Sequence, residues 1–470
     1  MTITESPEYA SPPAEDPDLM RNAVRRQFEA DFARPPEEFF ETGTEDFGAD
    51  PLPKDQFLTA GYHQREARHL WRKTWQMACR ERAVANPGDY VTYEIVDQSV
   101  LIVRDKKGQL KAYHNVCLHR GTRLAEGSGQ LGAGGAFSCS FHGWTWNLDG
   151  SLKRVPCAWD FPKVEPSSYG LREVQAGTWD GWVFVNLDPQ APPLADYLGE
   201  VLPRHFSLWP MKNRRIVAYG AKVLPCNWKV AIEAFMETYH VLRTHPESIP
   251  FAYDAGAQYD QWGLHARMIQ LVGKASPHLL PGTYDEQEVV DALLGGQTTQ
   301  VGEEPQTPRV PEGSTARKVL ADGARAGLTQ VYGIDLSAAS DSEVLDAVEY
   351  YIFPNFIVWG GYSFPIVYRS RPNGNDHESC FFEAMLVAPD GDDPGPDAEM
   401  QILPTQTSWA EAPGMGGVGY VLDQDDRNIR KIQLGLHSDG LTGVSFSQYQ
   451  EGNIRALHHG VKQYLEAAAE

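Results

Sequence analysis

The sequence predicts an α+β protein in which a small antiparallel β domain precedes a larger domain of strands and helices. Its 470 residues, 42% of them hydrophobic, suit one large or two moderate domains. Apolar residues recur close to every second position over 90–103, and residues 181–187 also read as a strand. After the prolines at 189–193, strand patterns alternate with helical ones, which indicates a second domain of mixed structure.

The N-terminal 55 residues are expected to form a disordered tail, because the chain begins with an acidic, Pro-rich stretch. Met1 to Asp18 has no basic, apolar or cleavable pattern, so it does not predict a signal peptide. No apolar run approaches the ~20 residues that a membrane span needs. The net charge of −22 argues against nucleic acid as a partner.

The six cysteines lack a disulfide-like framework and therefore favour a reducing cytoplasm. Two of them belong to the paired motifs described below. We expect the other four to be buried thiols: Cys79, Cys157, Cys226 and Cys380.

The expected elements follow in chain order. Leu70, Trp71 and Trp75 stand at helical spacing in a helix over 57–79. The β domain, 82–188, contains strands at 90–103, 110–116, 146–152 and 181–187. Residues 189–470 form the larger domain, with strands at 216–224, 350–369 and 378–387, helices at 227–245, 424–437 and 448–465, and much loop over 281–342.

Two short motifs pair a thiol with an imidazole. The first holds Cys117 and His119, and the second holds Cys139 and His142, after a Gly-rich spacer. Two Cys and two His are the ligands of a 2Fe-2S cluster whose second iron is bound by histidine. A structural zinc site needs the same ligands, so spacing alone does not separate the two.

A second candidate metal site lies in the helix expected over 227–245. On a helix, Glu233, Glu237 and His240 share one face. His245 joins His240 only if the helix bends or ends, and Pro246 gives a reason for it to end. Two His with one carboxylate from elsewhere make the facial triad that binds non-heme Fe(II).

The motifs CLHRG (117–121) and CSFHGW (139–144) resemble the Rieske 2Fe-2S family, which favours iron–sulfur over zinc. The run from Asn227 to His245 is similar to the catalytic helix of Rieske non-heme iron oxygenases, with Glu237 where most members have Asp. The resemblance implies the α (catalytic) subunit, similar to aromatic-ring-hydroxylating dioxygenases. It also implies a catalytic domain with a central antiparallel sheet flanked by helices, with residues 56–81 packing on it as an N-terminal helix.

The same resemblance implies the cofactors and the site. Cys117, His119, Cys139 and His142 would bind the 2Fe-2S cluster, and His240, His245 and a downstream Asp would bind a mononuclear Fe(II). Counting back from Gln433 favours Asp425 as that ligand, whereas matching the double Asp favours Asp426. We choose Asp425.

The family further implies a homotrimer in which Glu237 bridges His240 and a cluster His of the next subunit. The electron donor would be a ferredoxin, an NAD(P)H-dependent reductase or both, and a β subunit could join the trimer. O2 and a small hydrophobic or aromatic molecule would be the substrates. Candidate pocket walls are apolar: Phe235, Met236, Phe356 and Trp359.

Three alternatives stay open on sequence. The same aromatic residues could cage a quaternary ammonium, which would make the protein a monooxygenase acting on a methylated amine. A zinc-stabilised interaction protein would share the Cys and His ligands without catalysis. An electron-transfer Rieske protein would need only the β domain, and the long chain after residue 188 argues against it.

Overall fold

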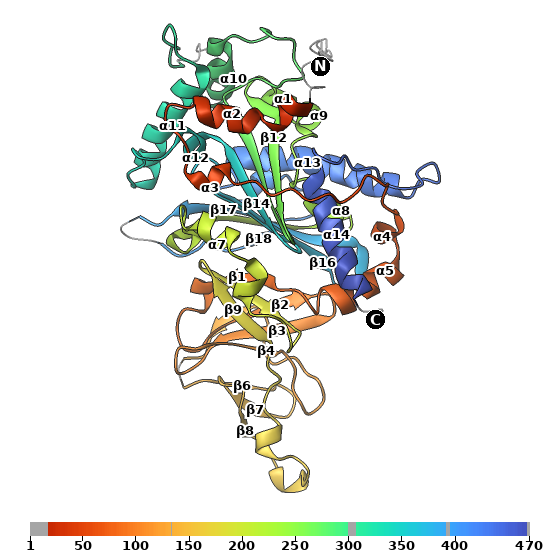
Figure 1. The fold of residues 1–470 in the computed structure, drawn as a ribbon. Helices are drawn as coiled ribbons and strands as arrows, with labels where there is room; N and C mark the ends of the chain where they lie inside the picture. The colour runs from red at the N-terminus through yellow and green to blue at the C-terminus, as the bar shows by residue number, and fades with distance from the viewer. Residues whose placement is uncertain (1–16, 133, 299–306, 392–394, 468–470) are drawn as a thin grey trace. The chain divides into compact units, whose positions relative to one another are not determined.

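The structure, a computed structural model, describes residues 17–132, 134–298, 307–391 and 395–467. The chain divides into two compact units, each considered by itself. The first unit holds the chain up to Leu58 together with Arg204–Ser370 and Glu378–Gly460, and the second holds Thr59–Pro203, Arg371–His377 and the residues from Val461 onward. Figure 1 labels their helices and strands. The α+β fold class predicted from sequence is confirmed.

The second unit is built from three small sheets with the strand orders β4-β3-β2-β5, β6-β7-β8 and β1-β10-β9. The expected strand over 90–103 is a hairpin, because the chain turns back at Val96. The strands of this unit are β1 (Gln76–Arg80), β2 (Asp89–Ile95), β3 (Gln98–Arg104), β4 (Leu110–His114), β5 (Ser128–Gln130), β6 (Ala136–Ser138), β7 (Thr145–Asn147), β8 (Leu152–Arg154), β9 (Gln175–Trp179) and β10 (Trp182–Asn186).

The helix expected over 57–79 is shorter than its pattern suggests. Helical turns cover α4 (Asp55–Leu58), α5 (Ala60–Arg65) and a π-helical turn at Glu66–Leu70, and the chain then enters β1. β1 pairs with β10, which buries Met77 on a sheet. Residues from Thr59 onward group with the β domain, whereas α4 groups with the first unit.

The first unit is organised on an eight-stranded sheet with the order β12-β13-β14-β15-β16-β17-β11-β18. β11 runs antiparallel to β17, whereas the short edge strand β18 runs parallel to β11. These strands are β11 (Arg214–Leu224), β12 (Ala252–Trp262), β13 (His265–Val272), β14 (Ala347–Ile352), β15 (Phe356–Trp359), β16 (Ile366–Asn373), β17 (Asp376–Pro389) and β18 (Gln401–Ile402).

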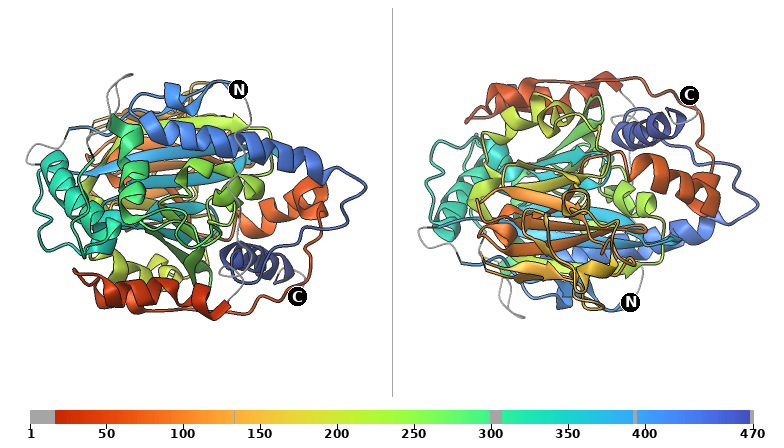
Figure 2. Two further views of the ribbon diagram at one scale, coloured as in Figure 1. Left: turned by 90° about the horizontal axis from the view of Figure 1, so that it is seen from above. Right: turned by 90° about the horizontal axis from the view of Figure 1, so that it is seen from below.

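The two faces of this sheet are covered differently. Register places Tyr351 and Tyr368 on one face, where the Ser370 hydroxyl donates to the carbonyl of Trp228 in α8 (Trp228–Glu233). The other face carries Tyr350 and Arg267, which contact the segment of residues 38–41 and α7 (Val201–Phe206). Figure 2 (left) shows α13 (Gly416–Leu436), in blue, and the red α1 and α2 on opposite sides of the sheet.

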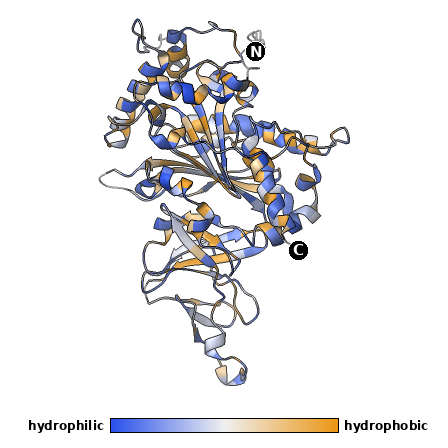
Figure 3. Ribbon diagram, viewed as in Figure 1, coloured by the Kyte–Doolittle hydropathy of each residue, from blue (hydrophilic) through white to orange (hydrophobic). Residues whose placement is uncertain are grey.

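The region 281–342, expected to be largely loop, is largely helical where it is described. Val289, Leu320 and Val344 form a small core against the sheet, and this packing compensates for the Gly and Thr residues that weaken the helical pattern. Its helices carry both hydrophilic and hydrophobic residues, as expected of helices that bury one face (Figure 3). They are α10 (Glu286–Thr298), α11 (Ala316–Tyr332) and α12 (Asp341–Leu345).

The tail expected to be disordered over 1–55 is instead folded from residue 17 onward, and residues 1–16 lie outside the described part. It forms α1 (Pro17–Arg21), α2 (Ala23–Ala30) and α3 (Glu37–Phe40) before α4. Val24 and Phe28 are buried one helical turn apart, and Arg317 Nη2 donates to Asp31 Oδ2 at 2.7 Å. One acidic residue of this segment, Asp31, therefore pairs with a buried arginine, so the acidic composition does not reflect solvation alone.

Three α-helices of the described residues remain, one in the second unit, one between His240 and His245, and one near the C-terminus. Among the residues that the structure places, no helix is both long and apolar enough to cross a membrane. Of the four other cysteines, Cys226 and Cys380 are buried as expected, but Cys79 is half-buried and Cys157 is exposed. These helices are α6 (Leu194–Leu198), α9 (Val241–Thr244) and α14 (Gly452–Glu466).

Candidate functional site: two metal-ligand clusters

The two Cys/His motifs of the second unit fold into two loops of matching geometry. The Cys117 N–H donates to the Thr122 carbonyl at 2.7 Å, and the Cys139 N–H donates to the Trp144 carbonyl at 2.8 Å. In each loop the closing glycine, Gly121 or Gly143, donates its N–H back to the Cys carbonyl at 2.9 Å. Both glycines have positive φ, which side-chain-bearing residues rarely adopt.

The two loops bring their four candidate ligands together. Cys117 and Cys139 are almost fully buried, whereas His142 is exposed. The imidazoles of His119 and His142 have ring centroids 4.6 Å apart, and the ring of His119 stacks on Trp144. Buried thiols beside one half-buried and one exposed imidazole fit a cluster whose inner iron takes sulfur and whose outer iron takes nitrogen.

In the first unit, the helix expected over 227–245 is broken into two. α8 begins after Asn227, whose side chain accepts the Lys229 N–H, and ends at Glu233. The following turn is held in place by Thr238, whose N–H donates to the Tyr259 hydroxyl at 3.1 Å. The one-turn helix α9 then has His240 at its N-terminal end and His245 at its C-terminal end. The break aims both imidazoles at one point, which a continuous helix does not allow.

The ligand atoms of His240, His245 and Asp425 all lie within 4.8 Å of one another. Asp425 Oδ1 is 3.0 Å from His245 Nε2 and 3.6 Å from His240 Nε2. The same oxygen is buried and has no hydrogen-bond donor in the described part of the chain. Two imidazole nitrogens and a carboxylate oxygen left without donors fit a divalent metal with open positions.

The other nitrogen of each imidazole is already engaged. His240 Nδ1 lies 2.7 Å from Glu237 Oε1, and His245 Nδ1 lies 2.7 Å from Gln424 Oε1. Because both acceptors call for a proton on Nδ1, both Nε2 atoms present lone pairs toward Asp425. Glu237 was predicted from sequence to act here, whereas Gln424 was missed; its only signal was its position next to Asp425 in sequence.

The structure separates the two aspartates between which the sequence could not fully decide. Asp426 faces the other way, at 3.4 Å from Lys222 Nζ and 2.6 Å from Arg430 Nε. Both aspartates lie inside α13, which begins at Gly416, so the acidic turn expected to open this helix is part of its interior. Consecutive residues of a helix point about 100° apart, which explains why one Asp reaches the histidines and the other reaches cations.

The charges around the two histidines favour a cation. Burial alone would lower the pKa of His240, but the neighbouring Glu237 and Asp425 carboxylates raise it to about 9. Glu233, expected on the same face as Glu237, instead accepts a hydrogen bond from His458 at 2.7 Å. The negative potential at His240 Nε2 thus comes chiefly from the carboxylates of Glu237 and Asp425.

A cavity of about 270 Å³ opens beside His240 and Asp425. Its walls combine the aromatic rings of Phe57 and Phe446 with the carboxyl groups of Glu233 and Glu451. None of the four pocket residues expected from sequence lines this cavity. Their contacts lie elsewhere: Phe235 packs against the rings of Tyr368 and Phe382, Met236 and Phe356 are buried, and Trp359 contacts Phe364.

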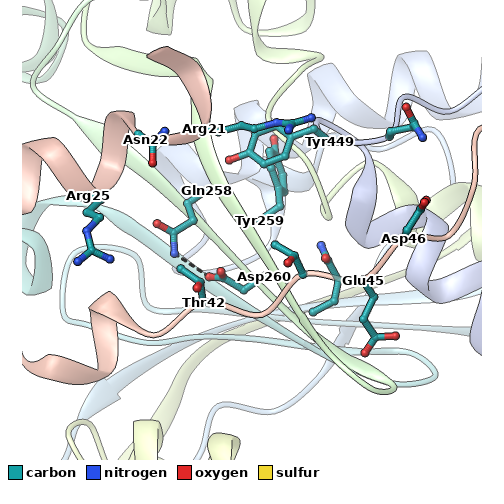
Figure 4. A pocket seen from close by; sticks show the side chains of 13 residues that line it. Arg21, Asn22, Arg25, Thr42, Glu45, Asp46, Gln258, Tyr259, Asp260 and Tyr449 are labelled. Carbon is teal, nitrogen blue, oxygen red and sulfur yellow. Dashed lines mark hydrogen bonds between the residues drawn. The ribbon is translucent and has the colours of Figure 1, made fainter. Parts of the chain in front are cut away.

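A larger cavity of about 670 Å³ lies between the N-terminal segment and β12 (Figure 4). Arg21 and Arg25 stand at one side of it, and Glu45 and Asp46 stand at the other. Within its wall, the Gln258 side chain donates a hydrogen bond to the Asp260 carboxylate at 2.9 Å. Size alone does not make it the reactive site, because the metal-binding triad lies elsewhere.

Comparison with known families covers both units. Residues 209–467 match the family described as the ring-hydroxylating alpha subunit (catalytic domain), and residues 74–165 match the Rieske [2Fe-2S] domain. The second match begins before the expected boundary at residue 82, in agreement with strand β1. The two matches imply a Rieske cluster and a mononuclear iron.

Among curated proteins, the carnitine monooxygenase oxygenase subunit of Acinetobacter pittii is 30% identical over 208 residues, 43% of this chain and 56% of that protein. The chlorobenzene dioxygenase subunit alpha of Cupriavidus sp. is 34% identical over 190 residues, 39% of this chain and 41% of that protein. The glycine betaine monooxygenase oxygenase subunit of Pseudomonas aeruginosa is 30% identical over 198 residues, 42% of this chain and 45% of that protein. The matched stretch therefore spans little more than half of the first relative.

Solved structures share the fold over most of the chain. The quaternary ammonium Rieske monooxygenase CntA in complex with L-carnitine superposes with a TM-score of 0.60 at 18% identity, covering 88% of this chain and 95% of that one. Naphthalene 1,2-dioxygenase with indole bound gives a TM-score of 0.60 at 18% identity over 90% and 93%. The family resemblance drawn from the sequence motifs is confirmed. The chain belongs to the ring-hydroxylating alpha-subunit family and carries a Rieske [2Fe-2S] domain ahead of its catalytic domain.

Proposed function

We propose that the protein is the oxygenase component of a Rieske non-heme iron system and oxidises a small organic molecule with O2. The observation that carries this proposal is the convergence of His240, His245 and Asp425 in a chain that also holds a Cys/His pair of loops. Two separate metal sites suit a reaction that needs one site for electron supply and another for oxygen.

We assign His240, His245 and Asp425 as the ligands of the mononuclear Fe(II), and Cys117, His119, Cys139 and His142 as those of the cluster. When bound, the mononuclear iron supplies the site of oxygen activation and the cluster supplies the additional electron that Fe(II) lacks. Glu237 and Gln424 hold the Nδ1 protons of the two histidines, so that each ring keeps its orientation and presents Nε2.

Glu237 also has the position expected of a link between metal sites. Its carboxylate is buried and accepts both the backbone N–H of His240 at 3.0 Å and the ring nitrogen of His240 at 2.7 Å. In the proposed homotrimer, Glu237 would also accept a hydrogen bond from a cluster histidine of the next subunit, His119 or His142. Such a ring is a heterologous assembly closed by threefold symmetry.

The partners follow from the electron requirement. A ferredoxin, an NAD(P)H-dependent reductase or both would reduce the cluster, and a separate β subunit could join the trimer. The exposed His142 supports contact of the imidazole side of the cluster with the next subunit of the proposed trimer. We place the protein in the cytoplasm, where its six cysteines, all free in the structure, would stay reduced.

The first candidate substrate is an aromatic or other hydrophobic molecule, and its product would be hydroxylated. A second candidate is a methylated or quaternary amine, which a monooxygenase would demethylate or cleave. The aromatic and acidic walls of the cavity beside His240 support the second candidate, because carboxylates and aromatic faces both attract cations. The carnitine and glycine betaine enzymes among the relatives act on such compounds by name.

Metal analysis of the purified protein tests the proposal. We expect about three irons per chain and the reduced-state EPR signal of a Rieske cluster. NADH-driven oxygen consumption with a generic reductase, measured over aromatic acids, hydrocarbons and methylated amines, then identifies the substrate class. A colourless protein that contains zinc in place of iron would refute the proposal and support a zinc-stabilised interaction protein instead.

A further inference from the structure

Glu349 occupies an unusual place in the middle of the eight-stranded sheet. It stands in β14, directly opposite Met268 in β13 and Trp359 in β15. Tyr259 in β12 lies opposite Met268 and extends the same row. Because directly opposed residues of a sheet point to the same face, all four side chains project to one side.

That side is the one that faces the triad. The Tyr259 hydroxyl accepts the N–H of Thr238, the residue after Glu237. Tyr368, on the same face, is fully buried, and its pKa is raised by burial and by the charges of Asp425 and Glu349. The Tyr368 hydroxyl thus lies within electrostatic reach of both the proposed iron ligand and Glu349.

Glu349 is 2% exposed, and its Oε2 has no hydrogen-bond partner among the described residues. Three other carboxylates of the same unit with similar burial are each paired with an arginine, whereas buried Asp254 accepts a hydrogen bond from the Ser276 hydroxyl at 2.7 Å. Asp260 lies 2.7 Å from Arg267, Glu383 lies 2.6 Å from Arg369, and Asp346 lies 2.6 Å from Arg317. In these three pairs, a neighbouring guanidinium neutralises the charge of a buried carboxylate that has a structural role.

A buried carboxyl group without a partner destabilises the folded protein, because it loses its hydration and gains nothing in return. Burial, followed by the charge of Glu237, raises the pKa of Glu349 well above its usual range, and the nearby Trp359 opposes this only in part. A ligand that supplies a positive charge at Glu349 would remove the penalty.

We propose that Glu349 is a substrate-recognition group on the triad-facing side of the sheet, separate from the walls of the cavity beside His240, and that it binds a positively charged nitrogen of the substrate. This inference rests on the proposed function and narrows it to a methylated amine or quaternary ammonium. The register places Trp359 beside Glu349 and Tyr259 in the same row, and aromatic side chains favour an alkylammonium group over a hydroxyl or carbonyl group.

Two pairs of isosteres test the charge preference in the wild-type protein. Choline is compared with 3,3-dimethylbutan-1-ol, and phenyltrimethylammonium is compared with tert-butylbenzene. Binding is followed by calorimetry and by the EPR signal of nitric oxide bound to the ferrous protein. We expect the cation of each pair to bind at least about tenfold more tightly, which corresponds to about 1.4 kcal/mol. Equal or tighter binding of the neutral member would overturn the proposal.

Variants then assign the preference to Glu349. Glu349→Gln should abolish the discrimination between the isosteres, Glu349→Asp should retain part of it, and Glu312→Gln, on the exposed surface, should leave it unchanged. A Glu349→Gln protein that folds and still prefers the cations would contradict the inference. Calorimetry needs no iron, so a missing iron site would count against the proposed function while the charge preference would still be measured.

Discussion

His245 Nε2 lies 3.0 Å from Asp425 Oδ1, and both side chains are buried. The proton of His245 is held on the far side of the ring by Gln424, so the two facing atoms are both electron-pair donors. Two such atoms repel each other at this distance unless a cation lies between them. Their separation therefore fits a metal site and supplies the first prediction.

Asp425→Asn should remove the mononuclear iron and leave the cluster in place. Total iron should fall from about three to about two per chain, while the visible absorption of the cluster persists. Oxygen consumption should fall further than the roughly 10–100-fold that loss of an outer ligand partner causes. The control is Asp426→Asn, which breaks the contacts with Lys222 and Arg430 but should keep the iron. Iron loss in the control and not in Asp425→Asn would reverse the assignment.

Gln424→Leu should weaken iron binding while preserving the three ligands. Without the Gln424 carbonyl, the His245 ring can rotate or carry its proton on Nε2, and iron affinity should drop by roughly 10–100-fold. Competition with a chelator measures the change. Asn428→Ala serves as the control, because Asn428 lies in the same helix and donates to Thr244 at 3.1 Å without touching a ligand. Unchanged iron retention in Gln424→Leu would show that Gln424 does not orient His245.

Glu237→Gln should keep both metals and slow the transfer of electrons between them. The neutral amide can still contact His240, but it loses the charge that favours a proton on Nδ1 and that would bind a cluster histidine of the next subunit. Stopped-flow reoxidation of the reduced cluster in the presence of substrate should slow by roughly 10–100-fold. The outcome that counts against this role is a wild-type rate of reoxidation with normal turnover.

The ligand residues could be predicted from sequence because each stands in a short motif, whereas their geometry depends on contacts that no motif contains. The break between α8 and α9 is fixed by Thr238 and Tyr259, which belong to separate elements. Gln424 becomes visible as a partner of His245 only when α13 is placed beside α9. The aromatic residues expected in the pocket, Phe235, Phe356 and Trp359, do not line the cavity beside His240, because apolar side chains near a site serve the core as readily as the substrate.

Local composition also gave wrong predictions for two peripheral regions. Acidic and Pro-rich residues predicted a tail through residue 55, yet Phe28 and Phe39 are buried against the sheet unit and Asp31 pairs with Arg317. Gly and Thr predicted loops over 281–342, yet a Ser340–Glu343 capping box opens α12 there. In both regions tertiary packing outweighs the propensity of the isolated segment.

A buried histidine in contact with the N-terminal segment, His205, makes the stability of the first unit sensitive to acid. His205 is fully buried between the Tyr350 hydroxyl, 2.9 Å from its Nδ1, and the Glu41 carboxylate, 3.1 Å from its Nε2. Burial and then the charge of Arg267 lower its pKa to about 4, despite the opposing effect of Glu41. In the unfolded chain the pKa of His205 returns to about 6.5.

Because the folded state binds this proton less tightly, the contribution of neutral His205 to stability is complete above pH 6.5 and is lost as the pH falls toward 4. The loss amounts to roughly 3 kcal/mol in the free energy of unfolding. Calorimetric unfolding between pH 7 and 4 should show it as a falling midpoint, and His205→Gln should flatten that dependence. His437→Gln removes an exposed histidine near Glu378 and should leave the curve unchanged. If His205→Gln retained the wild-type slope, another buried group would have to take up the proton.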